Sequence, residues 1–202
     1  MKPPRTVVFD LGKVLLNFDY AIAVNKLAAR CATNASELKQ LDQSPLLVRY
    51  ETGQLTTEQF FAEAQAAIGF RGHLAEFAGI FGDIFTPIPP MIQLNEELRV
   101  RGVPTYIFSN TNELAIRHIR QTYAFFKNFN GYIFSYEHGA MKPDGQLYEV
   151  VEKMTACRGG ELAYWDDRSE NVAAGLKRGW RAFLHQSPAQ SRLAMQQLGL
   201  LA

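Results

Sequence analysis

Short apolar stretches alternate with longer amphipathic stretches along most of the chain. Five short stretches, each four to six residues long, are bounded by Gly, Pro or polar residues: Thr6–Leu11, Pro104–Ser109, Tyr132–Ser135, Leu162–Asp166 and Arg181–Leu184. This pattern is typical of strands that are buried on both faces of a parallel sheet. Between most of them, apolar residues recur at helical spacing, as in Met91–Leu98, Leu147–Met154 and Val172–Leu176. The alternation predicts an α/β fold with right-handed crossovers.

The segment between the first predicted strand and Pro87 breaks this rhythm, because it contains no stretch that we interpret as a strand. Helices are predicted over Ala21–Ala32, over Ser36–Leu41 and after Thr56, where capping-type residues precede an apolar pair. An ordinary α/β connection is far shorter than this segment. We therefore predict an inserted helical subdomain, with Ile84–Met91 as its return hinge.

The predicted organisation is a Rossmann-like parallel sheet core flanked by helices, with an inserted small α-helical cap. Residues 1–16 and 88–202 are assigned to the core, and residues 17–87 to the cap.

Composition and charge exclude several classes of protein. The chain has 202 residues, of which 47% are hydrophobic and 20% charged, so it can bury a sizeable core. Its net charge is +1 and it has no dense basic run, so we expect no nucleic-acid partner. No apolar run approaches the about 20 residues of a membrane helix, and the start does not resemble a signal peptide. Cys31 and Cys157 have no metal or redox spacing. We expect a cytoplasmic protein without a membrane partner, a monomer or weak homodimer.

Four segments at or after predicted strand ends carry polar residues suited to one site: Asp10 with Gly12, Ser109 with Asn110, Lys142 before Pro143, and Asp166 with Asp167. In open parallel sheets, ligands bind at the carboxyl ends of the strands. Each segment alone has an ordinary explanation, namely a strand end, a helix N-cap by Asn112, a solvated lysine or an N-capping carboxylate pair. Their occurrence together favours a site for phosphate transfer.

The chemistry of each group supports that interpretation. A hydroxyl such as that of Ser109, with free amides at a helix start, forms a phosphate cradle, and Lys142 can place a point charge on a phosphate oxygen. Adjacent carboxylates disfavour ionisation unless a cation offsets their charge. Hard oxygen ligands of this kind suit Mg²⁺.

These segments resemble the four motifs of the haloacid dehalogenase-like hydrolase superfamily, and they span essentially the whole chain. The motifs are FDLGKVL with Asp10, FSNT with Ser109, MKP with Lys142, and WDD with Asp166 and Asp167. The resemblance implies that Asp10 attacks the phosphorus of a phosphate ester and forms an aspartyl-phosphate, which water hydrolyses.

The resemblance also implies a ligand set. Mg²⁺ would be held by Asp10, the backbone carbonyl of Gly12 and Asp167, with Asp166 orienting a metal-bound water. Ser109, the amide of Asn110, and Lys142 would bind the phosphoryl group that is transferred.

The predicted cap contains the stretch YETGQLT at residues 50–56, which resembles cap sequences of the branch that includes bacterial α-glucose-1-phosphate phosphatases. This resemblance implies a sugar phosphate, such as a sugar-1-phosphate, as substrate. Arg49, Tyr50 and Glu51 are candidates to face the substrate, but the sequence does not orient them.

Position 12 departs from the family pattern, which usually has a second aspartate two residues after the nucleophile as general acid and base. Losing a positioned acid or base typically costs about 10²–10⁴-fold in rate. The leading hypothesis is therefore a phosphatase restricted to good leaving groups. A catalytically weak phosphate-binding or regulatory protein is one alternative. A metal-independent 2-haloacid dehalogenase is another, although Asp166 and Asp167 argue against it.

Residues outside the motifs receive structural interpretations. Asp19 either supplies a substitute carboxylate or caps a helix that begins near Ala21. Trp165 and the aromatic residues at 123–129 are predicted to pack in the core. The four histidines show no paired metal spacing.

Overall fold

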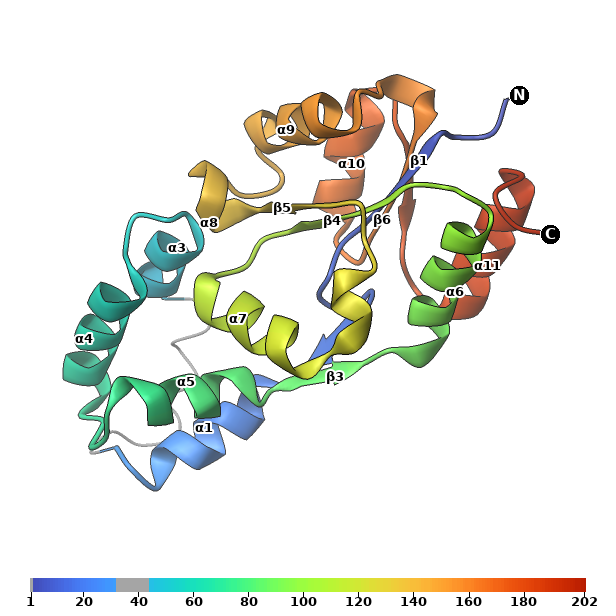
Figure 1. Cartoon of the computed structure of the whole chain (residues 1–202). Coiled ribbons are helices and arrows are strands. Elements are labelled where there is room, and N and C mark those ends of the chain that lie inside the picture. Colours follow the sequence, from blue (N-terminus) through green and yellow to red (C-terminus); the bar gives the residue numbers. More distant parts are fainter. Residues whose placement is uncertain (1, 32–43) are drawn as a thin grey trace.

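The five predicted strands form one parallel sheet. A computed structural model describes residues 2–31 and 44–202, and its main sheet has the strand order β5-β4-β1-β6-β7 (Figure 1). These strands are β1 (Thr6–Phe9), β4 (Thr105–Ser109), β5 (Gly131–Phe134), β6 (Leu162–Asp166) and β7 (Arg181–Leu184). Because β1 is central and pairs in parallel with both β4 and β6, the chain switches sides of the sheet there. Ligands bind at such switch points in α/β folds.

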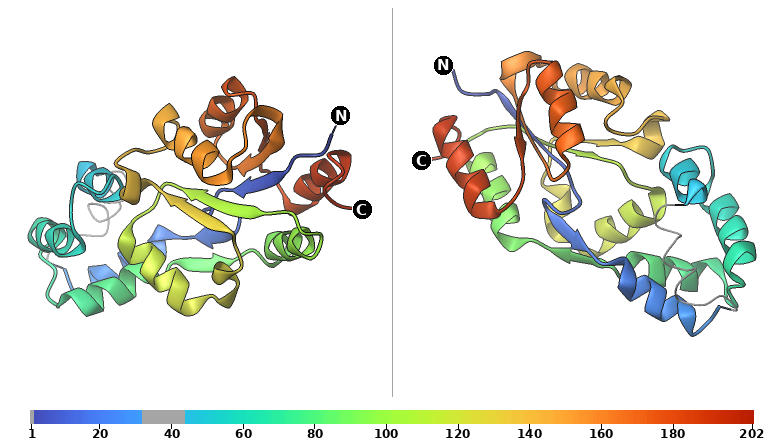
Figure 2. Two further views of the ribbon diagram at one scale, coloured as in Figure 1. Left: turned by 45° about the horizontal axis from the view of Figure 1, so that its top comes forward. Right: turned by 180° about the vertical axis from the view of Figure 1, so that it is seen from behind.

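Helices cover both faces of this sheet (Figure 2). Apolar residues of α6 (Pro89–Val100), α7 (Glu113–Thr122) and α11 (Pro188–Gln197) form one core cluster against the sheet. Those of α9 (Gly145–Thr155) and α10 (Ser169–Lys177) form a second cluster on the opposite face. Short helical turns complete the core: η2 (Ala124–Lys127), α8 (Ser135–His138) and η3 (Gly159–Glu161). The Rossmann-like core is thus confirmed.

Local capping chemistry explains where α7 begins. The Asn112 side chain accepts a hydrogen bond from the amide of Ala115 at 3.0 Å, as the N-cap interpretation predicted. The predicted packing of the aromatic residues is also confirmed, because Trp165 is fully buried and stacks on Phe183, and Phe126 is buried in the same cluster.

Four described helices lie in the insert between β1 and β4: α1 (Tyr20–Ala28), α3 (Pro45–Glu51), α4 (Thr57–Ile68) and α5 (Leu74–Gly82). They gather at the side of the molecule toward which β4 and β5 run (Figure 1). They share an apolar core of their own, which includes Tyr50, Phe60 and Phe77 and also Leu114 of α7. The insert therefore packs on the start of α7. The helix predicted over Ser36–Leu41 lies outside the described residues.

The prediction that this segment contains no strand was wrong. Strands β2 (Leu16–Phe18) and β3 (Phe85–Pro87) form an antiparallel ribbon at the two ends of the insert. Strands this short carry too few residues for a period-two pattern, and Pro87 reads as a breaker because it lacks an N–H. We propose that the core and cap meet within this ribbon, at the predicted boundaries 16/17 and 87/88.

In the described part of the chain, none of the helices combines the length and apolar character needed to cross a membrane.

Candidate active site

The turn after β1 presents Asp10 at the carboxyl end of the sheet. The Asp10 amide donates to the carbonyl of Trp165 at 2.8 Å, which extends the pairing of β1 with β6. Its Oδ1 accepts a hydrogen bond from the amide of Leu11 at 2.7 Å, so the carboxyl group is oriented by its own turn. The chain then bends sharply through Gly12 and through Lys13, which has a φ of 56°.

Lys142 lies between two carboxylates in the interior of the protein. Its Nζ is 2.8 Å from Oδ1 of Asp10 and 2.7 Å from Oδ2 of Asp166, and it also donates to the carbonyl of Phe108 at 2.9 Å. Its side chain is only 1% exposed. Burial lowers the pKa of Lys142, but the two carboxylates raise it by more, so the ammonium group remains charged.

Asn110 holds Lys142 in place through the main chain. Its Oδ1 accepts a hydrogen bond from the Lys142 amide at 2.7 Å, and its Nδ2 donates to the Lys142 carbonyl at 2.9 Å. The side chain of Asn110 is thus committed to the backbone of the third motif. The nearby Ser109 hydroxyl is buried and donates to the Asn110 carbonyl at 3.3 Å.

Asp166 is fully buried and its two oxygens are saturated with donors. Besides Lys142, they accept hydrogen bonds from the hydroxyl of Tyr164, the amide of Arg168 and Nδ2 of Asn171. Burial raises the pKa of Asp166, but Lys142 and these hydrogen bonds leave it below its ordinary value. Asp166 is therefore an ionised group that holds Lys142.

Three carboxylates meet at this edge of the sheet. Asp10, Asp166 and Asp167 each offer an oxygen, and these oxygens lie within 4.8 Å of one another. Burial and then the neighbouring Asp166 raise the pKa of Asp167. Burial raises the pKa of Asp10 to about 7, even though Lys142 lowers it. One ammonium group does not balance three carboxylates, so the cluster suits a divalent cation.

A second observation fits a hydrated cation. The Oδ1 atom of Asn171 is buried and has no hydrogen-bond partner among the described residues, while Asn171 lines the cavity beside Asp10 and Asp167. A buried acceptor of this kind can receive a hydrogen bond from a water on the metal, as Mg²⁺ usually retains several waters.

These groups surround one cavity of about 200 Å³. Of the residues predicted from the sequence, the cavity is lined by Asp10, Gly12, Ser109, Asn110, Lys142 and Asp167. Asp166 contacts Lys142 at 2.7 Å and does not line the cavity. The structure thus brings the predicted site residues together.

The cavity also has walls that the motifs did not indicate: Phe18, Tyr20, Glu51, Met141, Arg168 and Asn171. The three cap residues that the sequence did not orient lie in different places in the structure. Arg49 pairs with Glu63 at 2.8 Å on the surface, Tyr50 is buried, and Glu51 reaches the cavity. The only sequence signal for Glu51 was the YETG stretch, which does not show direction.

Glu51 is held at the junction between the insert and the core. It ends α3, and its carboxyl group accepts a hydrogen bond from the side chain of Asn112. The hydroxyl of Tyr50, the residue before Glu51, accepts a hydrogen bond from the amide of Leu114 at 3.1 Å. This bond connects the end of α3 to α7. In the following turn, Gly53 has a φ of 67°, and a Cβ there would lie 2.2 Å from the carbonyl oxygen of Tyr136. The turn thus requires glycine.

Asp19 does not supply a carboxylate to the cavity. Its side chain caps α1 by accepting a hydrogen bond from the amide of Ala21 at 2.9 Å. Asp19 is not among the residues that line the cavity. Of the two interpretations of Asp19, the helix cap is confirmed.

Glu51→Gln is expected to stabilise the protein at alkaline pH. Burial raises the pKa of Glu51 to about 7, opposed by the Asn112 hydrogen bond. The folded wild type therefore retains a proton that the unfolded chain releases, and it loses stability relative to the variant as pH rises from about 4.5 to about 7. Since Glu51 keeps some solvent exposure, we expect a gain of about 1–2 kcal/mol, or about 3–6 °C in melting temperature, at pH 8.

The measurement is thermal unfolding of both proteins in metal-free buffer at about pH 5 and pH 8. The other charged groups that line the cavity, Asp10, Lys142, Asp167 and Arg168, are present in both proteins. Their titration is therefore largely removed in the difference between the two. An equal melting-temperature difference at both pH values would contradict the prediction.

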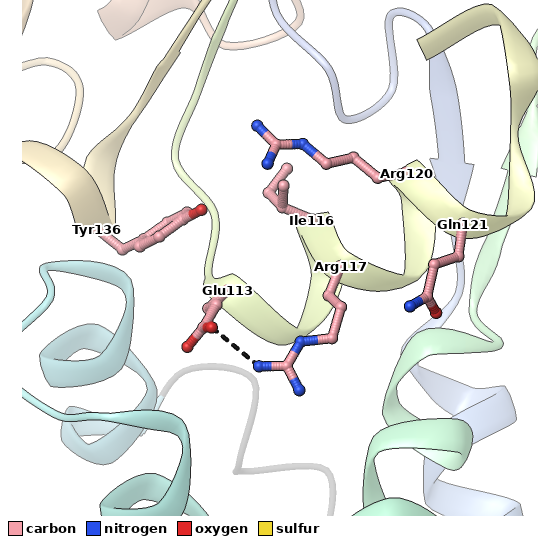
Figure 3. A pocket seen from close by; sticks show the side chains of 6 residues that line it. All are labelled: Glu113, Ile116, Arg117, Arg120, Gln121 and Tyr136. Atoms are coloured by element: carbon pink, nitrogen blue, oxygen red, sulfur yellow. Dashed lines mark hydrogen bonds and ion pairs between the residues drawn. The ribbon is translucent and has the colours of Figure 1, made fainter. Parts of the chain in front are cut away.

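A second hollow, of about 390 Å³, lies beside α7 and Tyr136 (Figure 3). Arg117 and Glu113, one turn apart on α7, form an ion pair of 2.9 Å in its wall. The guanidinium of Arg120 lies over the rings of Tyr132 and Phe134. None of the residues predicted for the site lines this hollow, whereas Asp10, Lys142 and Asp167 line the smaller cavity.

Comparison with known proteins shows which family the chain matches. The haloacid dehalogenase-like hydrolase family matches residues 4–179. The sesquiterpene phosphatase astK of Aspergillus oryzae is 25% identical over 173 residues, which cover 84% of this chain and 84% of that protein.

Solved structures share the fold at low sequence identity. A HAD family enzyme of Bacteroides thetaiotaomicron, in complex with magnesium and inorganic phosphate, has a TM-score of 0.79 at 18% identity and covers 91% of this chain and 94% of its own. A predicted HAD-like hydrolase of Porphyromonas gingivalis has a TM-score of 0.79 at 21% identity, with coverage of 95% and 98%. The L-2-haloacid dehalogenase of Xanthobacter autotrophicus has a TM-score of 0.64 at 18% identity, with coverage of 97% and 83%.

The family match spans residues 4–179, which is most of the chain. The chain belongs to the haloacid dehalogenase-like hydrolase family.

Proposed function

We propose that this hydrolase is a Mg²⁺-dependent phosphatase, which cleaves a small phosphate ester through an aspartyl-phosphate on Asp10. The observation that carries the proposal is the position of Asp10, which contacts Lys142 at 2.8 Å and shares a cluster of carboxylate oxygens within 4.8 Å with Asp166 and Asp167. A carboxylate nucleophile beside one cation and one acidic metal cluster is an arrangement that phosphoryl transfer uses.

Each residue has a defined part in this proposal. Asp10, Asp167 and the carbonyl of Gly12 would hold Mg²⁺, which neutralises charge on the phosphoryl oxygens when it is bound. Asp166 is saturated by other donors, so we assign it to positioning Lys142 and metal-bound water. Lys142, Ser109 and the main-chain amide of Asn110 would hold the phosphoryl group in line with Asp10.

A sugar phosphate, such as a sugar-1-phosphate, is the proposed substrate class. The cap sequence at residues 50–56 resembles that of α-glucose-1-phosphate phosphatases. Polar side chains of Glu51, Arg168 and Asn171 line a cavity of about 200 Å³, which suits a small hydroxylated leaving group.

A phosphate ester of an apolar alcohol is the second candidate. Phe18, Tyr20 and Met141 form apolar parts of the same cavity wall, and the relative from Aspergillus oryzae is described as a sesquiterpene phosphatase. The two candidates differ in the leaving group and share the chemistry at phosphorus.

The two other hypotheses are less well supported. A metal-independent dehalogenase would have to hold an anionic substrate against three carboxylates that share one buried ammonium group. A catalytically weak phosphate-binding protein would not need Asp10 to be oriented by both Leu11 and Lys142.

A panel of phosphate monoesters, which contains sugar-1-phosphates, sugar-6-phosphates, aryl phosphates and prenyl monophosphates, tests the proposal. We expect release of inorganic phosphate that requires Mg²⁺ and stops with EDTA. Preference for sugar-1-phosphates over prenyl monophosphates would favour the first substrate class. Tight binding of Mg²⁺ and a phosphate mimic with no turnover would favour the regulatory alternative, and release of halide from a 2-haloacid without Mg²⁺ would favour the dehalogenase.

A further inference from the structure

The space beside Gly12 is filled by an aromatic ring. A Cβ at position 12 would lie 2.8 Å from Cε1 of Phe18. Nζ of Lys13 lies over the ring of Phe18 at 4.4 Å from its centre, and the ring packs edge-on against Tyr20 and Phe85. The ring is therefore braced from several sides. An acid or base for the leaving group cannot be placed at position 12 unless Phe18 moves, so it has to come from another element.

Three carboxyl groups line the cavity: those of Asp10, Glu51 and Asp167. Asp10 is engaged by Lys142, and Asp167 belongs to the acidic cluster. Glu51 is outside that cluster, and no ion pair among the described residues includes it. Its hydrogen-bond partner is the neutral side chain of Asn112. Glu51 is thus the cavity carboxyl group that is free to exchange a proton with a substrate.

The position of Glu51 is also fixed relative to the nucleophile. Asn112 follows the Ser109 segment directly and caps α7 through its Oδ1, while its other side-chain group holds the Glu51 carboxyl. The Tyr50–Leu114 hydrogen bond ties the end of α3 to the same helix start. Glu51 therefore reaches the cavity from the cap side, opposite the sheet that carries Asp10. Burial that raises its pKa to about 7 lets it both donate and accept a proton near neutrality.

We propose that Glu51 is the general acid and general base of the reaction, supplied by the cap in place of a group at position 12. This inference rests on the proposed phosphatase function. It differs from the expectation that the enzyme acts only on esters with good leaving groups.

The two steps balance as follows. In the first, an oxygen of Asp10 forms a bond to phosphorus, the bond from phosphorus to the ester oxygen breaks, and the Glu51 carboxyl proton passes to that oxygen to give the alcohol. In the second, a water oxygen bonds to phosphorus, the Glu51 carboxylate takes a proton from that water, and the bond from phosphorus to Asp10 breaks. Inorganic phosphate leaves, and both carboxyl groups return to their starting states.

The test compares wild type and Glu51→Gln on 4-nitrophenyl phosphate, whose leaving group needs no proton, and benzyl phosphate, whose alkoxide does. The amide oxygen of the variant can still accept the Asn112 hydrogen bond, so the fold should be preserved. We expect kcat/KM for benzyl phosphate to fall by about 10²–10⁴-fold, and that for 4-nitrophenyl phosphate to change by less than about threefold. Because the second step also loses its base, kcat for 4-nitrophenyl phosphate should fall, with a burst of one nitrophenol per enzyme.

Glu58→Gln, an exposed carboxyl on α4 of the same cap, is the matched control and should behave as wild type. An equal loss of kcat/KM on both esters would overturn the inference, because it would indicate a structural role for Glu51. No loss on either ester would also overturn it. The inference would also be overturned if the wild-type enzyme released nitrophenol from 4-nitrophenyl phosphate but no benzyl alcohol from benzyl phosphate. A wild type inactive on the whole phosphate panel would instead reject the proposed function, and the inference with it.

Discussion

Asp10→Asn is expected to lower turnover of every phosphate ester by about 10⁴–10⁶-fold. The amide offers no anionic oxygen to attack phosphorus, so the aspartyl-phosphate cannot form. The same substitution should leave the fold intact, because the asparagine Oδ1 can still accept from the Leu11 amide, as Asp10 does at 2.7 Å. The substitution also removes a buried carboxyl group, and burial raises the pKa of that group to about 7. Steady-state phosphate release with Mg²⁺, together with thermal unfolding without it, checks both parts.

Asp19→Asn is the control for this variant. Asp19 caps α1 away from the cavity, and asparagine is an equally good cap, so neither turnover nor stability should change appreciably. Turnover of Asp10→Asn within tenfold of wild type would show that another group attacks phosphorus.

Lys142→Met is expected to destabilise the protein by about 3–5 kcal/mol, because it leaves buried carboxylates without their cation. Lys142 contacts Asp10 at 2.8 Å and Asp166 at 2.7 Å with a side chain that is 1% exposed. The corresponding fall in melting temperature is about 10 °C for a chain of this size. Turnover should be lost as well, because the same ammonium group is proposed to bind the phosphoryl oxygens. Urea unfolding at neutral pH measures the loss.

Lys26→Met provides the matched control at the surface. Lys26 pairs with Asp83, but their side chains are 44% and 64% exposed, so the pair should contribute less than about 1 kcal/mol. If Lys142→Met were as stable as wild type, Asp10 and Asp166 could not both be ionised beside Lys142 in the folded protein.

The pattern of neighbouring residues in the sequence was sufficient to predict the main elements of the core. The strands observed at Thr6–Phe9 and Leu162–Asp166 match short apolar stretches that were visible in the chain. The N-cap at Asn112 also followed from neighbouring residues. These features depend on the properties of adjacent side chains, and a buried parallel strand needs a continuous apolar run whatever its neighbours are. The convergence of the four motif segments followed because carboxyl ends of parallel strands share one edge of the sheet.

The insert was less predictable. Its helical character could be recognised, but the ribbon formed by Leu16–Phe18 and Phe85–Pro87 could not, because each strand is stabilised by a partner far away in the chain. The same applies to Asp166 and Asp167, which look equivalent in sequence. Only the packing around the sheet buries Asp166 among donors and leaves Asp167 at the cavity.

The sequence by itself determined the alternating core, the helical insert and the residue types available for phosphate chemistry, since each depends on periodicity or on spacing within a segment. The tertiary structure alone decided which cap residue enters the cavity and which side chain occupies the space beside Gly12. Glu51 points inward because Tyr50 docks on Leu114, 64 positions away, and Phe18 occupies the space beside Gly12 because the chain folds back there. Contacts between residues so far apart depend on how whole elements pack, which no local pattern specifies.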